Sequence, residues 1–267
     1  MATQTETTNL ALFCDFEIVA LGVREARYAE FDVKKVLERL LLKGNIVVKK
    51  AYCDWERYRD FKKAMHEAAF ELIEVPHVRI SGKNSADIRM VVDALDLCYT
   101  KGHVDTFVVV SGDSDFSPLV SKLRENDKTV IGVGVKNSTS DLLISNCDEF
   151  IYYDDLVRED EAKRRAAKKR RETRPADAAK EAAPSDDKKQ EAFDLVIETL
   201  QALVAERGEG ERIWGSMVKQ ALKRRKPGFN ESYYGFKAFS DLLEELEHRK
   251  LLALERDEKS GGYVVRL

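Results

Sequence analysis

Four aspartates are the residues of this chain whose type and spacing could do chemistry. Asp15 lies at the end of an apolar run, LALFCDF, and Asp113 and Asp115 follow another apolar run within SGDSDF. Asp87 lies in KNSADIRM, where Ser85 is a suitable cap that places Asp87 in the first turn of a helix. Several converging carboxylates are what a hard divalent cation such as Mg²⁺ or Mn²⁺ requires. Since such a cation activates water and neutralises a phosphodiester, the pattern predicts a metal-dependent hydrolytic site.

Each aspartate taken alone also has an ordinary structural explanation, because Asp at the junction of a strand and a loop often caps a helix or makes a turn. The hypothesis of a site therefore depends on the elements that would bring the four side chains together.

Five short apolar runs indicate the strands that would hold these aspartates. They cover residues 10–16, 46–51, 107–111, 129–135 and 150–153. Apolar residues at three- and four-residue spacing lie between them, as at 33–41 and 88–95, and this spacing is typical of amphipathic helices. Buried strands alternating with helices predict an α/β domain over residues 1–157, with a parallel sheet covered on both faces. Loops at the carboxyl ends of such strands surround the binding crevice, where we expect the aspartates.

The remainder of the chain divides into a charged segment and a second domain. Residues 158–190 carry 12 Lys/Arg and 8 Asp/Glu without any large apolar residue, so we predict a charged flexible linker, helical in part before Pro175. Its KRRAAKKRR run either contacts phosphates or only keeps the linker solvated. Apolar periodicity resumes in residues 191–267, with three predicted helices and a terminal hairpin around a Ser-Gly-Gly turn. This order of elements predicts a winged-helix-like domain.

The composition argues against several other kinds of protein. Neither the four cysteines nor the four histidines have the spacing of a zinc site, and the cysteines form no disulfide framework. Free thiols among apolar neighbours are typical of a reducing compartment. No apolar stretch approaches the roughly 20 residues of a membrane helix, and the start MATQTETTN lacks the pattern of a signal peptide. We therefore expect a cytoplasmic protein that does not enter a membrane.

Four segments of the first domain follow one another in the order of known family motifs. They are LFCDFE, KNSADIRMVVDAL, FVVVSGDSDFSPLVSKLRENDKTVIGVG and SDLLISNCDEFIYYDDL, and they span about residues 9–157. In these motifs the chain resembles the NYN family, the bacterial LabA-like proteins of the PIN nuclease superfamily. The resemblance implies a PIN-like doubly wound parallel sheet and a ribonuclease site that uses Mg²⁺ or Mn²⁺. The positions matching the family's acids are Asp15, Asp87, Asp93, Asp113 and Asp115.

Two positions stand apart within this resemblance. Asp93 follows Asp87 by six residues, about 120° away around a helix of 3.6 residues per turn, so both cannot point squarely at one ion. The family's first motif runs Asp-Phe-Glu-Asn, and this chain has Ile18 where the Asn belongs. A side chain that forms hydrogen bonds is thus replaced by one that forms none. The acids are complete, but a neighbouring group on which full activity would depend is altered.

The second domain has distinctive segments of its own. They are Lys-Pro-Gly-Phe at 226–229, Tyr-Gly-Phe at 234–236 and Phe-Ser-Asp-Leu-Leu at 239–243. In these the domain is similar to the LOTUS or OST-HTH domain, which implies an RNA-binding winged helix. Basic side chains beside aromatic ones supply phosphate contacts and stacking surfaces for RNA. The candidate RNA-binding residues are Lys219, Lys223, Arg224, Arg225, Lys226, Tyr233 and Tyr234.

The function expected of the chain is the hydrolysis of RNA phosphodiester bonds by a metal-dependent ribonuclease whose C-terminal domain binds RNA. The expected catalytic residues and metal ligands are Asp15, Asp87, Asp113 and Asp115, and the resemblance adds Asp93 as a ligand. One alternative is a catalytically weak RNA-binding adaptor that keeps the PIN-like fold. Another is a regulator that docks a protein partner, which the near-zero net charge of residues 191–267 also fits. RNA preference, the number of metal ions and the oligomeric state stay open.

Overall fold

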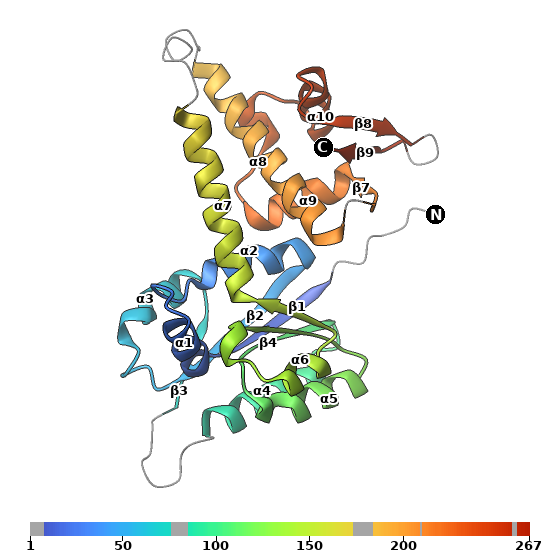
Figure 1. Ribbon diagram of the computed structural model, residues 1–267. Helices are drawn as coiled ribbons and strands as arrows, with labels where there is room; N and C mark the ends of the chain where they lie inside the picture. The colour runs from blue at the N-terminus through green and yellow to red at the C-terminus, as the bar shows by residue number, and fades with distance from the viewer. Residues whose placement is uncertain (1–7, 76–84, 173–183, 209, 258–260) are drawn as a thin grey trace. The chain divides into compact units, whose positions relative to one another are not determined.

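The structure is a computed structural model that describes residues 8–75, 85–172, 184–208, 210–257 and 261–267. The chain divides into two compact units, one formed mainly by residues 7–165 and the other mainly by residues 166–267 (Figure 1). Each unit has its own hydrophobic core. Within the residues that the structure describes, no helix combines the length and the apolar character needed to cross a membrane.

A six-stranded parallel sheet forms the centre of the first unit. Its strands are β1 (Asn9–Asp15), β2 (Asn45–Cys53), β3 (Glu71–Glu74), β4 (Thr106–Val110), β5 (Thr129–Gly134) and β6 (Glu149–Tyr152). They are ordered β3-β2-β1-β4-β5-β6, and every neighbouring pair is parallel. The order reverses between β1 and β4, which places the carboxyl ends of these two strands side by side at the switch point where open α/β sheets bind ligands.

Helices cover both faces of this sheet, as a doubly wound fold requires (Figure 1). They are α1 (Phe16–Glu25), α2 (Val33–Lys43), α3 (Arg59–Glu67), α4 (Ser85–Thr100), α5 (Ser117–Glu125), α6 (Asp141–Asn146) and α7 (Tyr153–Glu172). Successive side chains of β1 point to opposite faces: Leu12 packs with α1, α2 and α3, whereas Phe13 packs with α4 and α5. The buried strands thus form two cores, one on each side of the sheet. The predicted α/β class is confirmed.

Two features of the first unit differ from the sequence-based expectation. Strand β3, Glu71–Glu74, was not anticipated, because this edge strand is only four residues long and both of its glutamates are exposed. The predicted flexible linker, residues 158–190, is helical at both ends: α7 continues to Glu172, and α8 begins at Pro184. The sequence interpretation had allowed a helix only before Pro175. Residues 173–183 lie outside the described part of the chain, and the domain boundaries themselves stay a prediction.

The second unit combines helices with a small antiparallel sheet. Its elements are α8 (Pro184–Arg207), β7 (Ile213–Trp214), α9 (Gly215–Arg225), η4 (Glu231–Tyr234), α10 (Phe239–His248), β8 (Ala253–Arg256) and β9 (Tyr263–Arg266). The expected terminal hairpin is β8 and β9, and β7 adds a third strand on the far side of β9. Phe193, Leu222 and Leu242 represent the three helices in one buried core. The hairpin tip, residues 258–260, lies outside the described residues.

Candidate functional site

Asp15, the last residue of β1, has its carboxyl group inside the protein. Only 3% of the residue is accessible to solvent. The pKa of Asp15 is raised to about 7, chiefly by burial and then by the charge of Asp87, while hydrogen bonds from the Ser111 hydroxyl and the Ile18 backbone amide oppose the rise. Removing a carboxylate from water disfavours its charged form, and a second nearby carboxylate adds repulsion. A buried acid that is kept near another acid in this way is typical of a functional site.

Three hydrogen bonds in series link Asp15, at the end of β1, to the two acids that follow β4. The Asp115 amide donates to Oδ1 of Asp113 at 2.9 Å, which caps the short 3₁₀ helix η1 (Ser114–Phe116). The Asp113 amide donates to Oγ of Ser111 at 3.2 Å, and this hydroxyl donates to Oδ2 of Asp15 at 3.0 Å. Because β1 and β4 are neighbours, Ser111 bridges the two strand ends. The loop after β4 is thereby fixed against the end of β1.

A glycine allows this loop to approach the neighbouring segment closely. A Cβ atom on Gly112 would lie 2.2 Å from the backbone oxygen of Ser138, far inside any normal contact. The Ser140 amide also donates to the Gly112 oxygen at 2.9 Å. Glycine is therefore needed between Ser111 and Asp113 for the acids to stand where they do.

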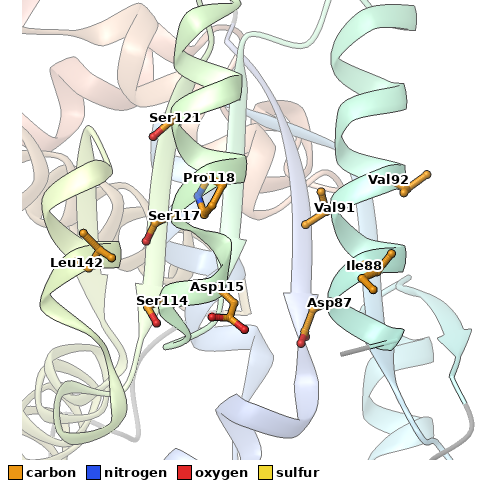
Figure 2. Close-up of a pocket in the computed structure, with 10 residues that line it drawn as sticks. All are labelled: Asp87, Ile88, Val91, Val92, Ser114, Asp115, Ser117, Pro118, Ser121 and Leu142. Carbon is orange, nitrogen blue, oxygen red and sulfur yellow. The ribbon is translucent and has the colours of Figure 1, made fainter. Parts of the chain in front are cut away.

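Asp87 joins the group from the first turn of α4, as expected. Its pKa is raised to about 6, first by burial and then by the charges of Asp113, Asp115 and Glu17. Figure 2 shows Asp87 and Asp115 at the same end of the cleft that α4 and α5 border. The structure thus brings all four sequence-predicted aspartates to one edge of the sheet.

Two depressions flank the acid group. The larger, about 700 Å³, is called the apolar cleft here; its lining residues are Asp87, Ile88, Val91, Val92, Ser114, Asp115, Ser117, Pro118, Ser121 and Leu142 (Figure 2). The smaller, about 370 Å³, is called the hydroxyl groove; its lining residues are Ile18, Gly112, Asp113, Ser114, Ser138, Thr139 and Ser140. Ser114 belongs to both. The residue that departs from the family motif, Ile18, therefore lies in the wall of a groove that Asp113 also lines.

The donor set suits a hard divalent cation by its chemistry, since it consists of carboxylate oxygens. Two of the four groups have pKa values raised first by burial and then by the charge of neighbouring acids, and a bound dication would relieve that repulsion. Among the described residues, however, no three acidic, thiol or imidazole side chains already stand close enough to enclose an ion. Ion binding would therefore require small movements of these side chains.

Asp93, the fifth acid in the family match, is not brought to this group. Its carboxylate accepts hydrogen bonds from the Tyr52 hydroxyl at 2.9 Å, Nζ of Lys50 at 3.3 Å and Nε of Arg89 at 3.1 Å. These partners lie on β2 and on the same helix. Asp93 thus forms ion pairs over β2, in agreement with its angle of about 120° from Asp87, and its assignment as a metal ligand stays a prediction.

The predicted RNA surface of the second unit is only partly assembled. Lys223 and Lys226 are exposed at the end of α9, and Tyr233 is exposed on η4. Lys219, half-buried, pairs with Glu231 at 2.9 Å. Tyr234 stacks on Phe229, with ring centroids 5.3 Å apart.

Two arginines of the predicted set do not belong to the exposed edge. Only 9% of the Arg225 side chain is exposed, and its guanidinium donates to Glu198 at 2.8 Å and to the Thr199 hydroxyl at 3.2 Å, both on α8. Arg224 is half-buried, and burial lowers its pKa. Arg225 thus links α9 to α8, and a contact with RNA stays a prediction for it.

Two serines of the site were not singled out by the sequence. Ser111 bridges Asp15 and Asp113, and the parallel register, which pairs Cys14 with Val110, would have placed it beside Asp15. Ser117, at the start of α5, lines the apolar cleft with a buried hydroxyl that has no hydrogen-bond partner. That this hydroxyl is buried without a partner depends on tertiary packing, which the sequence does not show.

Comparison with known proteins supports both resemblances. The model of the NYN domain family matches residues 9–154, and that of the OST-HTH/LOTUS domain matches residues 193–263. An uncharacterised protein of Methanocaldococcus jannaschii is 30% identical over 120 residues, which cover 45% of this chain and 47% of that protein. The chain thus matches about half the length of this curated relative.

A crystal structure of a protein of unknown function from Vibrio parahaemolyticus is also similar. It is 28% identical with a TM-score of 0.51, over 57% of this chain and 96% of the other. The matches confirm the predicted α/β fold and the order of the two domains.

Proposed function

Because the chain belongs to the NYN domain family, within the PIN-like nuclease superfamily, we propose that it is a divalent-metal-dependent ribonuclease. The observation that carries the proposal is the convergence of four aspartates at the switch point of the sheet. Asp15 and Asp87 hold raised pKa values there, each in part because of nearby acids. Such a site is costly to keep without a ligand, and a cation with a bound phosphodiester is the ligand that matches its charge.

Asp15, Asp87, Asp113 and Asp115 are the residues that would hold the Mg²⁺ or Mn²⁺ ion. When bound, the ion supplies an activated water and neutralises charge on the phosphodiester. The hydroxyl of Ser111 donates a hydrogen bond that holds Oδ2 of Asp15 in a fixed orientation. Its own oxygen, Oγ, accepts a hydrogen bond from the Asp113 amide. The hydroxyls of the groove beside Asp113, among them Ser138 and Ser140, are suited to contact a sugar-phosphate backbone.

The second unit is proposed to bind the RNA. Its family match is to a domain associated with nucleic-acid or protein binding, and Lys223, Lys226 and Tyr233 lie exposed on neighbouring elements. Lysines pair with phosphates while an exposed aromatic ring stacks on a base. RNA binding by residues 184–267 should therefore weaken as salt rises. A salt-insensitive association with a protein would instead assign this unit to partner docking.

Cleavage of RNA by the purified full chain tests the proposal. Single-stranded RNA should be cut when Mn²⁺ is added and left intact in chelator, and Asp113→Asn should abolish cutting. The matched control is Asp96→Asn, which removes an exposed acid elsewhere on α4 and should keep full activity. Equal cutting by wild type and Asp113→Asn would mean that this group of acids is not the active site.

A catalytically weak RNA-binding adaptor is the second candidate. It is favoured by Ile18, which gives an apolar side chain to a groove that Asp113 lines. RNA binding without Mn²⁺-dependent cleavage would select this candidate. Ile18→Asn would then show whether this position alone is responsible.

A further inference from the structure

The apolar cleft is bordered by large apolar side chains that are unusually exposed. Ile88 and Val92 on α4 and Leu142 on α6 are each more than half exposed to solvent. They are not scattered over the surface, because all three line this one depression. Single exposed apolar residues are ordinary, whereas several around one depression indicate a binding surface.

The floor of the cleft is the beginning of α5, and it is polar. Figure 2 shows Ser117, Pro118 and Ser121 along this helix and Ser114 just before it, between α4 on one side and Leu142 on the other. The Ser117 residue is 6% exposed, and its hydroxyl oxygen has no hydrogen-bond partner. A buried hydroxyl without a hydrogen-bond partner destabilises the protein, so a group that satisfies it would be favoured there.

We propose that the apolar cleft binds one unpaired base of the nucleic-acid strand, adjacent to the bond that is cut. The proposal rests on the proposed function, since Asp87 and Asp115 line the same cleft and define where the phosphodiester would lie. Flat base faces cover aliphatic side chains, and base edges carry donors and acceptors for a serine hydroxyl. A volume of about 700 Å³ accommodates a base with its sugar.

This occupant implies selectivity for single strands. A base inside a duplex is stacked and paired, and it enters such a cleft only after it is unstacked at a cost in free energy. An unpaired strand has less of this cost to meet. Ser117, on the floor of the cleft, is then a specificity-determining residue, because a hydroxyl that pairs with one base edge leaves another unsatisfied.

Binding to single-stranded oligouridylate tests the proposal without requiring cleavage. Fluorescence anisotropy would measure the affinity for the intact labelled oligonucleotide and for a series of oligonucleotides. Each member of the series lacks one base, at a different position along the strand. The protein is the full chain carrying Asp113→Asn, so that the probe is not cut. The cleft variant is Val92→Ser with Leu142→Ser, and the matched control is Tyr99→Ser, equally exposed on α4 but outside the cleft.

The cleft variant should bind the intact strand about tenfold more weakly, which is about 1.4 kcal/mol. When the abasic residue stands at the position that the cleft would hold, and only then, the cleft variant and its parent should bind the oligonucleotide equally well. Tyr99→Ser should bind every oligonucleotide as its parent does. An equal loss at every abasic position, or no loss at all, would overturn the proposal. A fall in mass by light scattering in the cleft variant would also overturn it, because a second copy of the chain would then occupy the cleft.

Ser117→Ala supplies an independent test of specificity. Among four homopolymeric oligonucleotides, one for each base, it should weaken binding to the tightest binder by about tenfold and leave binding to the other three unchanged. Equal losses for all four would overturn the assigned role. Absence of cleavage by wild type in Mn²⁺ would refute the proposed function, yet these binding results would still decide whether the cleft holds a base.

Discussion

Replacing Asp15 with Asn is expected to make the metal-free protein more stable at neutral pH, although it removes a buried hydrogen-bonded group. Burial and the charge of Asp87 raise the Asp15 pKa from 3.8 to about 7. Each pKa unit corresponds to about 1.4 kcal/mol, so ionising this group in the folded protein costs about 4 kcal/mol relative to the unfolded chain. Asn removes that cost and loses about 1 kcal/mol in its contact with Ser111. The expected gain at pH 8 is about 3 kcal/mol.

The pH dependence of this gain has a defined sign because the Asp15 pKa is higher in the folded state. Below about pH 4 the group is protonated in both states, and the variant should be less stable by about 1 kcal/mol. Between about pH 4 and pH 7 the unfolded chain loses its proton first, so the stability of the wild type falls as pH rises. Above about pH 7 the difference stays constant.

Urea unfolding in the presence of a chelator measures the effect. A Trp214→Phe background makes the fluorescence report on Trp55, which is buried in the first unit. Asp96→Asn, at an exposed position of α4, is the matched control and should change stability little at any pH. Saturating Mn²⁺ should stabilise wild type but not Asp15→Asn, since an ion bound only to the folded state adds stability. A gain that is the same at pH 5 and pH 8 would refute the reasoning.

Three further predictions concern the neighbouring residues. Asp93→Asn should lower the free energy of unfolding by about 2 kcal/mol, because its bonds to charged partners are lost, and should leave the Mn²⁺ affinity measured by calorimetry unchanged. Ile18→Asn should raise the rate of RNA cleavage, measured on a gel, about tenfold, because one added hydrogen bond in the transition state is worth about that factor. An unchanged rate would contradict a role of the hydroxyl groove in cleavage. Lys223→Ala with Lys226→Ala should reduce the salt dependence of RNA binding by about 1.4 in log–log slope, whereas Arg225→Ala should instead lower stability in urea by unpairing Glu198.

The buried strands could be predicted because their apolar character is local. β1, β4 and β5 are continuous apolar runs, so Asp15 and Asp113 could be placed at strand ends and hence at one edge of a parallel sheet. β3 gave no such signal, because it pairs only with β2 at the sheet edge and has two half-buried side chains between two exposed glutamates. Its stability comes from pairing, which a sequence run does not reveal.

The candidate site could be predicted in its acids but not in their partners. Asp87 fell on the correct turn of a helix, yet its approach to Asp113 depends on how α4 packs against the sheet. Asp93 matched the family motif, but its carboxylate pairs with Lys50 on β2, which is distant in the sequence. Arg225 belongs to a basic run in the sequence, but its guanidinium pairs with Glu198 of α8. Such pairings depend on tertiary contacts that the residue type alone does not specify.

The hydrogen bond between Ser111 and Asp15 joins residues that are 96 positions apart in the chain. Contacts of such long sequence separation form late, because the loop that they close must first be ordered. During synthesis, a chain that ends before β4 carries Asp15 and Asp87 but neither Asp113 nor Asp115. The complete acid group therefore arises only after the loop that follows β4 has emerged and packed against the end of β1, so a shorter nascent chain carries no assembled acid group.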